Sequence, residues 1–194
     1  MKRLSVFILS LGILIGLLIA SKYINFNPFR TVGEPIDTFH NVTVYYNGAV
    51  NHVTKRNTAK DGYNLGLQYQ CVEFVKRYYY EYFNHKMPDS YGHAKDFFDS
   101  NVKDGSRNLQ RNLIQYTNGS SSKPKVHDII VFRASWYNSF GHVAIVCNVS
   151  ENQLTIIQQN AGPFSSTRVT YDLEEEHNHW KVKDNYIIGW LRKE

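Results

Sequence analysis

FGHVAIVCNVSENQLTIIQQN, residues 140–160, reads as two β-strands joined by a short polar turn. Side chains alternate across a strand, so residues 142, 144, 146 and 148 share one face and the residues between them share the other. We expect Val149 to pair with Gln153 across the turn. Because a slip by one residue would exchange the two faces, this register determines which side chains meet.

Residues 71–83, CVEFVKRYYYEYF, are typical of an amphipathic helix. Apolar or aromatic residues recur at positions 71, 74, 75, 78 and 82. The charged residues lie largely elsewhere, where Glu73 and Arg77 form a favourable i,i+4 pair. A shorter second helix is expected over residues 91–98.

A flexible Gly-Ser loop at residues 119–122 separates this helical half from a half rich in Val, Ile, Thr and Tyr. The strands expected there are residues 128–132, 142–149, 154–159, 168–173 and 186–192. Helices followed by strands indicate an α+β fold, with N-terminal helices packed on an antiparallel β-sheet.

The first 20 residues, MKRLSVFILSLGILIGLLIA, have a basic start followed by an uncharged, mostly apolar run. Lys2 and Arg3, with no acidic residue before Glu34, are typical of an export signal. The run exceeds the usual signal core of about 7–15 residues and approaches the ~17–25 that span a membrane. We therefore expect residues 1–21 to be a single transmembrane anchor or a cleaved signal peptide, with a buried core helix as the remaining alternative. The domain would lie on the extracytoplasmic side of the cell membrane, or be secreted or periplasmic after cleavage.

Proline and glycine residues mark residues 22–40 as a linker, so the folded domain is expected over residues 41–194. The chain has 194 residues with a net charge of +5. Two of the basic residues belong to the first segment, so the domain is nearly balanced and we expect no nucleic-acid partner. Two cysteines are too few for a disulfide framework or a four-thiolate zinc site.

A candidate catalytic site combines the helix with the hairpin. Cys71 begins the expected helix, where unpaired backbone N–H groups and the helix dipole favour a thiolate. The expected register places His142 opposite Asn160, with Gln158 as a diagonal neighbour on the same face. A cysteine nucleophile needs such an acid/base and a group that orients it. The pattern predicts a triad of Cys71, His142 and either Gln158 or Asn160, with the sulfur roughly 3–5 Å from a ring nitrogen.

Plainer interpretations remain open for these residues. Cys71 can be a small buried side chain, and His142 a hydrogen-bonded core residue. Cys147 is interpreted as core, with a Cys71–Cys147 disulfide as the alternative. Zinc held by Cys71, His142 and other histidines lacks the usual paired spacing. Residues 174–179, EEEHNH, are interpreted as a solvated loop rather than a cation site, and residues 78–83 as packing rather than a sugar platform.

Seven segments resemble the CHAP family of cysteine amidases and peptidases in their order and spacing. They are residues 61–66 (DGYNLG), 69–77 (YQCVEFVKR), 92–97 (GHAKDF), 123–132 (KPKVHDIIVF), 141–146 (GHVAIV), 157–160 (IQQN) and 188–190 (IGW). Within the family, the nearest likeness is to the amidase domain of the bifunctional glutathionylspermidine synthetase/amidase.

The resemblance implies a papain-like domain in which Cys71 is the nucleophile and His142 the general base. The family usually has Glu where this chain has Gln158. A neutral amide can fix the imidazole tautomer, as Asn does in papain-like enzymes, but it cannot stabilise the imidazolium by charge. His127 replaces a usual Gly, which affects the local turn. Residues 61–64 lack the second carboxylate of the calcium loop in some phage members, so we expect no metal and no cofactor.

These observations predict an exported, membrane-anchored cysteine amidase or endopeptidase that hydrolyses amide bonds of peptidoglycan peptides through a thioester. One alternative is an amidase of the glutathionylspermidine type acting on a small peptide amide, although that substrate is expected inside the cell. The other is a catalytically inactive cell-wall-binding module, because position 158 is not Glu.

Overall fold

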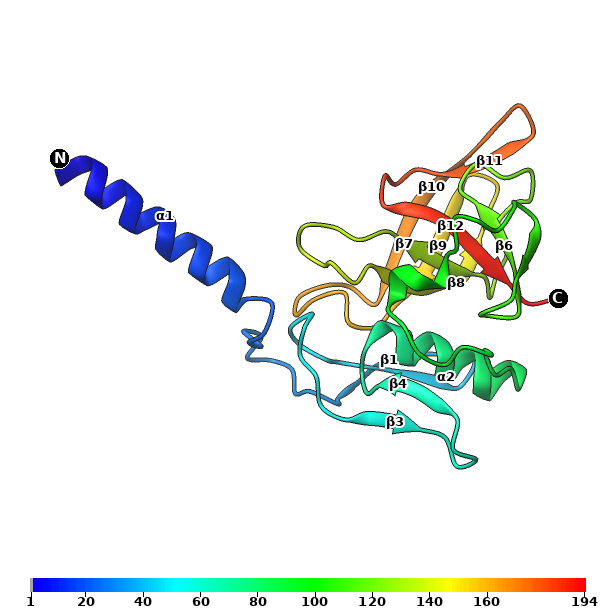
Figure 1. Ribbon diagram of the computed structural model, residues 1–194, viewed down its shortest axis with the longest axis horizontal. Helices are drawn as coiled ribbons and strands as arrows, with labels where there is room; N and C mark the ends of the chain where they lie inside the picture. The colour runs from blue at the N-terminus through cyan, green and yellow to red at the C-terminus, as the bar shows by residue number, and fades with distance from the viewer. Residues whose placement is uncertain (1) are drawn as a thin grey trace.

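The computed structural model describes residues 2–194 (Figure 1). Its first helix, α1 (Lys2–Ala20), projects away from the rest of the chain (Figure 1). No helix among the described residues has the length and apolar character needed to cross a membrane. The uncharged part of α1, residues 4–20, rises only about 26 Å, against a hydrocarbon core of about 30 Å. The predicted transmembrane segment ahead of the domain was therefore wrong.

An eight-stranded antiparallel sheet forms the centre of the domain, in the order β11-β10-β9-β8-β7-β12-β6-β5. Buried Val and Ile residues on both faces of its central strands make it the core of the domain. Its strands are β5 (Ser106–Asn108), β6 (Leu113–Thr117), β7 (Ile129–Phe132), β8 (His142–Val149), β9 (Gln153–Ile157), β10 (Arg168–Glu176), β11 (His179–Val182) and β12 (Ile187–Arg192).

The second α-helix, α2 (Cys71–Phe83), lies between this sheet and two small hairpins (Figure 1). The hairpins are β1 (Pro35–Phe39) with β2 (Val42–Tyr45), and β3 (Arg56–Thr58) with β4 (Asn64–Leu67). Phe74, Val75 and Tyr78 of α2 pack against the sheet in one apolar cluster. Because the hairpins cover the opposite side of α2, its charged residues Glu73, Lys76 and Arg77 are buried there, while Glu81 near the end of the helix is exposed.

The predicted fold class was wrong in its order of elements. Four strands precede α2, and the second expected helix is only one 3₁₀ turn, η1 (Ala94–Phe97). Gly92 has a left-handed φ of +101° and His93 is extended, so an α-helix cannot pass through them. The early strands are only three to five residues long, and the one clear alternation, VTVY in β2, extends over just four residues, the shortest run that indicates a strand. One of them, β1, comes from the C-terminal end of the predicted linker.

The β8–β9 hairpin forms, but its register changes along its length. Val149 pairs with Leu154 and not with Gln153, so that expected pair was wrong. The ladder contains a bulge at Cys147, because Val146 pairs with Ile156 while Asn148 pairs with Thr155. On the His142 side of the bulge, Ile145 pairs with Ile157 and Val146 with Ile156, which is the expected register.

Candidate active site

Cys71 is the first residue of α2 and opens onto a cleft of about 460 Å³. Gln70, the residue before it, is extended, and its carbonyl accepts the hydrogen bond from Phe74 N–H. The backbone N–H groups of Cys71 and Val72 therefore have no carbonyl one turn earlier in the helix. Instead, both N–H groups lower the pKa of the Cys71 thiol, because they favour its ionised form.

Burial outweighs these donors at the sulfur. Cys71 is only 7% exposed, and this desolvation raises the pKa of its thiol to about 11. Hydrogen bonds from the backbone N–H groups of Val143, Val72 and Cys71 itself lower the pKa, but by less. Cys71 is therefore a neutral thiol at pH 7, and the thiolate expected from its position at a helix start was wrong.

His142 and Gln158 form the second part of the site. Nε2 of His142 lies 2.9 Å from Oε1 of Gln158. The amide of Gln158 is held in this orientation because its Nε2 donates to the Ser166 carbonyl at 3.0 Å. Oε1 can only accept, so Nε2 of His142 carries the ring proton. Nδ1 is then the basic nitrogen of the imidazole.

Burial also determines the charge of His142. Desolvation lowers the pKa of the imidazole to about 4, and the hydrogen bond with Gln158 raises it by less. The ring is neutral at pH 7, so it can accept a proton. Cys71 and His142 are therefore both neutral at pH 7.

The backbone of β8 connects the two parts. Val143 follows His142 in the strand, and its backbone N–H is the first of the groups that lower the pKa of the Cys71 thiol. Cys71 therefore lies near the end of β8 where His142 begins the strand. The expected separation of roughly 3–5 Å between the sulfur and a ring nitrogen stays a prediction.

Asn160, the other candidate for orienting His142, has different partners. Its Oδ1 accepts a hydrogen bond from Asn47 at 3.0 Å, and its Nδ2 donates to the Val50 carbonyl at 2.9 Å and to Gln70. β9 ends at Ile157, and Asn160 has a φ of +60°, so the chain has turned away from β8 by this point. Asn160 lines the cleft beside Cys71, and of the two candidates it is Gln158 that contacts His142.

Sequence reasoning missed Gln159, which connects this segment to α2. Its Nε2 donates to the Gln70 carbonyl at 3.0 Å and to Glu73 at 2.9 Å, and its Oε1 accepts from Tyr45 N–H. Glu73 is itself buried in an ion pair with Arg77 at 2.6 Å. Of these three successive residues, Gln158 contacts His142, Gln159 contacts the start of α2, and Asn160 lines the cleft. Only the amide-rich run QQN in the sequence could have signalled this.

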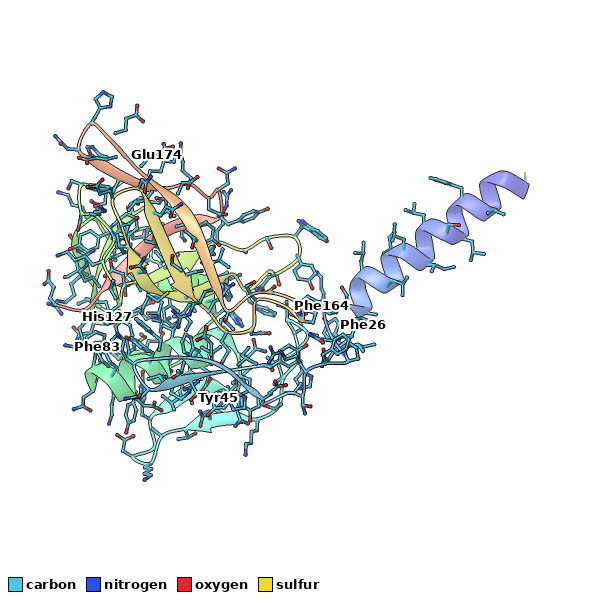
Figure 2. All side chains as sticks on the ribbon, turned by 180° about the vertical axis from the view of Figure 1, so that it is seen from behind. Phe26, Tyr45, Phe83, His127, Phe164 and Glu174 are labelled. Carbon is cyan, nitrogen blue, oxygen red and sulfur yellow. The ribbon has the colours of Figure 1, made fainter. Side chains whose placement is uncertain are left out.

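His127, which replaces a usual family Gly, has no part in this site. It has a φ of +78°, and Tyr78 and Tyr79 of α2 hydrogen-bond to its ring and carbonyl. Figure 2 shows it beside Phe83, at the end of α2 opposite Cys71. Cys147 likewise lies away from the cleft lining, and both cysteines are free thiols, so the alternative of a disulfide was wrong.

The chain is similar in sequence to known proteins. The chain is 28% identical over 161 residues to trypanothione synthetase of Crithidia fasciculata, a match that covers 77% of this chain and 24% of that protein. The chain thus spans about a quarter of the length of this curated relative. Among solved structures, Ly7917, also determined with the hydrolysis product of MDP, shares 27% identity with a TM-score of 0.28, covering 39% of this chain and 31% of that one. This structural likeness is too limited to support an argument.

A model of the CHAP domain matches residues 60–160, which is more than half of the chain and includes Cys71, His142 and Gln158. The resemblance noted in the sequence is thereby confirmed. The chain belongs to the CHAP domain family of amidase and peptidase hydrolases.

Proposed function

We propose that the chain is a cysteine amidase or endopeptidase in which Cys71 is the nucleophile and His142 the general base. One observation carries this proposal: the Gln158 amide holds the His142 tautomer that leaves Nδ1 basic, at the start of the strand whose next residue, Val143, lowers the pKa of the Cys71 thiol.

The proposed reaction begins from the neutral pair. As the Cys71 sulfur attacks the amide carbonyl, its proton passes to Nδ1 of His142, so no thiolate has to form beforehand. The backbone N–H of Cys71 and a neighbouring donor hold the oxyanion, because the first N–H groups of α2 have no carbonyl acceptor within the helix. The imidazolium gives its proton to the leaving amine. Water, deprotonated by Nδ1, then hydrolyses the thioester and restores the thiol.

Gln158 fits a positioning role in this reaction. Its Oε1 keeps the ring proton on Nε2 throughout, and its contact with Ser166 keeps the amide from rotating. A neutral partner does not stabilise the imidazolium by charge, so the active site depends on geometry more than on ion pairing. This argues against treating the missing Glu as a sign of an inactive module.

The substrate we propose is an amide bond of a peptidoglycan peptide, reached by export of the chain. The basic and apolar composition of residues 1–20, which is typical of export, supports this choice. A second candidate, an amidase acting on a glutathionylspermidine-type amide, is supported by the likeness to trypanothione synthetase. The two substrates share the same bond type and would use the same residues.

Turnover by the full chain tests the proposal. Isolated cell wall and glutathionylspermidine are offered separately, and new amino groups are counted. Cys71→Ala should abolish the release of amines, while Cys147→Ala, the matched control, should retain it, because Cys147 is absent from the cleft lining. Binding to the wall with no turnover of either substrate would contradict the enzyme proposal, and turnover of glutathionylspermidine alone would contradict the choice of substrate.

A further inference from the structure

Arg56 lies in the same cleft as the proposed nucleophile. It begins β3, pairs with Leu67 across the β3–β4 hairpin, and lines the cleft together with Cys71. The residue is exposed, so it stands at the rim of the cleft and not in its floor. A substrate bound at Cys71 therefore passes near a fixed positive charge.

The guanidinium of Arg56 is held in one orientation. Its Nη1 donates to Oδ1 of Asn64 at 2.9 Å, and its plane lies over the Tyr91 ring at 5.4 Å from the centroid. Asn64 is fixed in turn, because its Nδ2 donates to the Ser90 carbonyl at 2.7 Å and its Oδ1 accepts from Gly66 N–H. Stacking and one anchored nitrogen leave the rest of the guanidinium available to a ligand.

No carboxylate of the described residues balances this charge. Arg56 takes part in none of the ion pairs formed within residues 2–194, and neither Asp nor Glu is among the residues that line the cleft. Lys76 lies buried nearby and donates to the carbonyls of Asn64 and Ser90, the two residues that anchor Arg56. Burial, then Arg111, then Arg56 lower the pKa of Lys76, and Asp89 raises it by less.

We propose that Arg56 determines specificity by binding a free carboxylate of the substrate peptide while the scissile amide lies at Cys71. A guanidinium fork matches a carboxylate in a way that an ammonium or a neutral amide does not. The inference rests on the proposed function, because it assigns the substrate class of that same cleft: peptide amides that carry a carboxylate close to the bond that is cleaved.

The test uses the full chain and the tripeptide L-alanyl-γ-D-glutamyl-L-lysine. Four forms are compared: both carboxyl groups free, either one amidated, or both amidated. Arg56→Gln should lower kcat/KM at least about tenfold for the free form, the size expected for a lost charge-assisted hydrogen bond, and leave the doubly amidated form unchanged. Arg56→Lys should recover part of this loss. Lys55→Gln is the matched control, because Lys55 is the preceding basic residue and does not line the cleft.

The two singly amidated forms show which carboxylate Arg56 binds. Amidation of that carboxylate should abolish the difference in kcat/KM between wild type and Arg56→Gln, and amidation of the other should not. Binding to Cys71→Ala, measured by calorimetry, separates this inference from the proposed function. If no form is hydrolysed but Arg56→Gln in the Cys71→Ala background weakens binding of the free form alone, the carboxylate site stands and the reaction is wrong. Equal effects of Arg56→Gln on all four forms, or no binding of the free form, would overturn the inference.

Discussion

Replacing Gln158 with Glu places a negative charge beside the imidazole of His142, where the wild type has a neutral amide at 2.9 Å. With charge centres about 4 Å apart and an effective dielectric of about 20, the attraction is about 4 kcal/mol. This corresponds to a rise of about 3 in pKa, which the carboxylate's own desolvation reduces. We expect the pKa of His142 to rise from about 4 to between roughly 5 and 6.

The same change should favour catalysis at neutral pH. In the wild type the thiol pKa is about 11 and the imidazole pKa about 4, so moving the proton from Cys71 to His142 is strongly unfavourable. A higher imidazole pKa lowers this cost, and part of the gain appears in the transition state. We expect kcat/KM at pH 7 to stay the same or to rise by up to about tenfold.

The assay is the pH dependence of kcat/KM between about pH 3.5 and 8, for the wild type and for Gln158→Glu. Activity should appear as His142 loses its proton, so the acid midpoint should lie near pH 4 in the wild type and move upward in the variant. Gln153→Glu is the control, because Gln153 is exposed at the start of the same strand, β9. The reasoning is refuted if both proteins share one midpoint, or if the wild-type midpoint lies at the ordinary histidine value of about 6.5.

Three further predictions concern stability and the backbone. Glu73→Gln leaves Arg77 buried without its anion, so the free energy of unfolding measured in urea should fall by about 3 kcal/mol or more. The control variant Glu151→Gln, on the surface, should change this free energy little. Burial is the main cause that lowers the pKa of Lys76 from 10.5 to about 7, so above pH 7 the unfolded chain binds more protons than the folded chain. Lys76 should therefore make the free energy of unfolding rise between pH 7 and pH 9. A Lys76→Met variant that showed the same rise would contradict this. Gly141→Ala should lower both stability and kcat, because its φ is +74° and a Cβ would lie 2.7 Å from the Phe132 carbonyl, next to His142. Gly62→Ala, with a similar φ but open space around it, should cost only about 1 kcal/mol in thermal unfolding, and equal losses in the two variants would contradict the steric argument.

Local signals in the sequence predicted several elements correctly. The apolar spacing of residues 71–83 corresponds to α2 at both ends, and the Val- and Ile-rich run of residues 142–149 corresponds to β8. The same signals indicated Cys71, His142 and Gln158, because a helix start and a strand start are visible in a pattern of residue types. These inferences depend only on neighbours within a turn of helix or a few residues of strand.

Strands of three to five residues are too short to carry such a signal, and β1–β4 were missed for that reason. Their presence changes the environment of α2, because they cover the side that carries Glu73 and Arg77 and both residues are buried. The bulge at Cys147 was also invisible, although the register beyond it decides which side chains face His142. Pairing between strands is a long-range property, and the residues of one strand do not determine it.

The sequence by itself determined which reactive side chains exist and which elements carry them. Only the tertiary structure decided their chemical state: burial makes Cys71 a neutral thiol and His142 a neutral imidazole, although the helix start alone favours a thiolate. It also decided that Gln158, and not Asn160, contacts the ring, because the chain turns away after β9 ends. Desolvation and side-chain contacts arise from segments far apart in the chain, so they exist only once those segments have packed together.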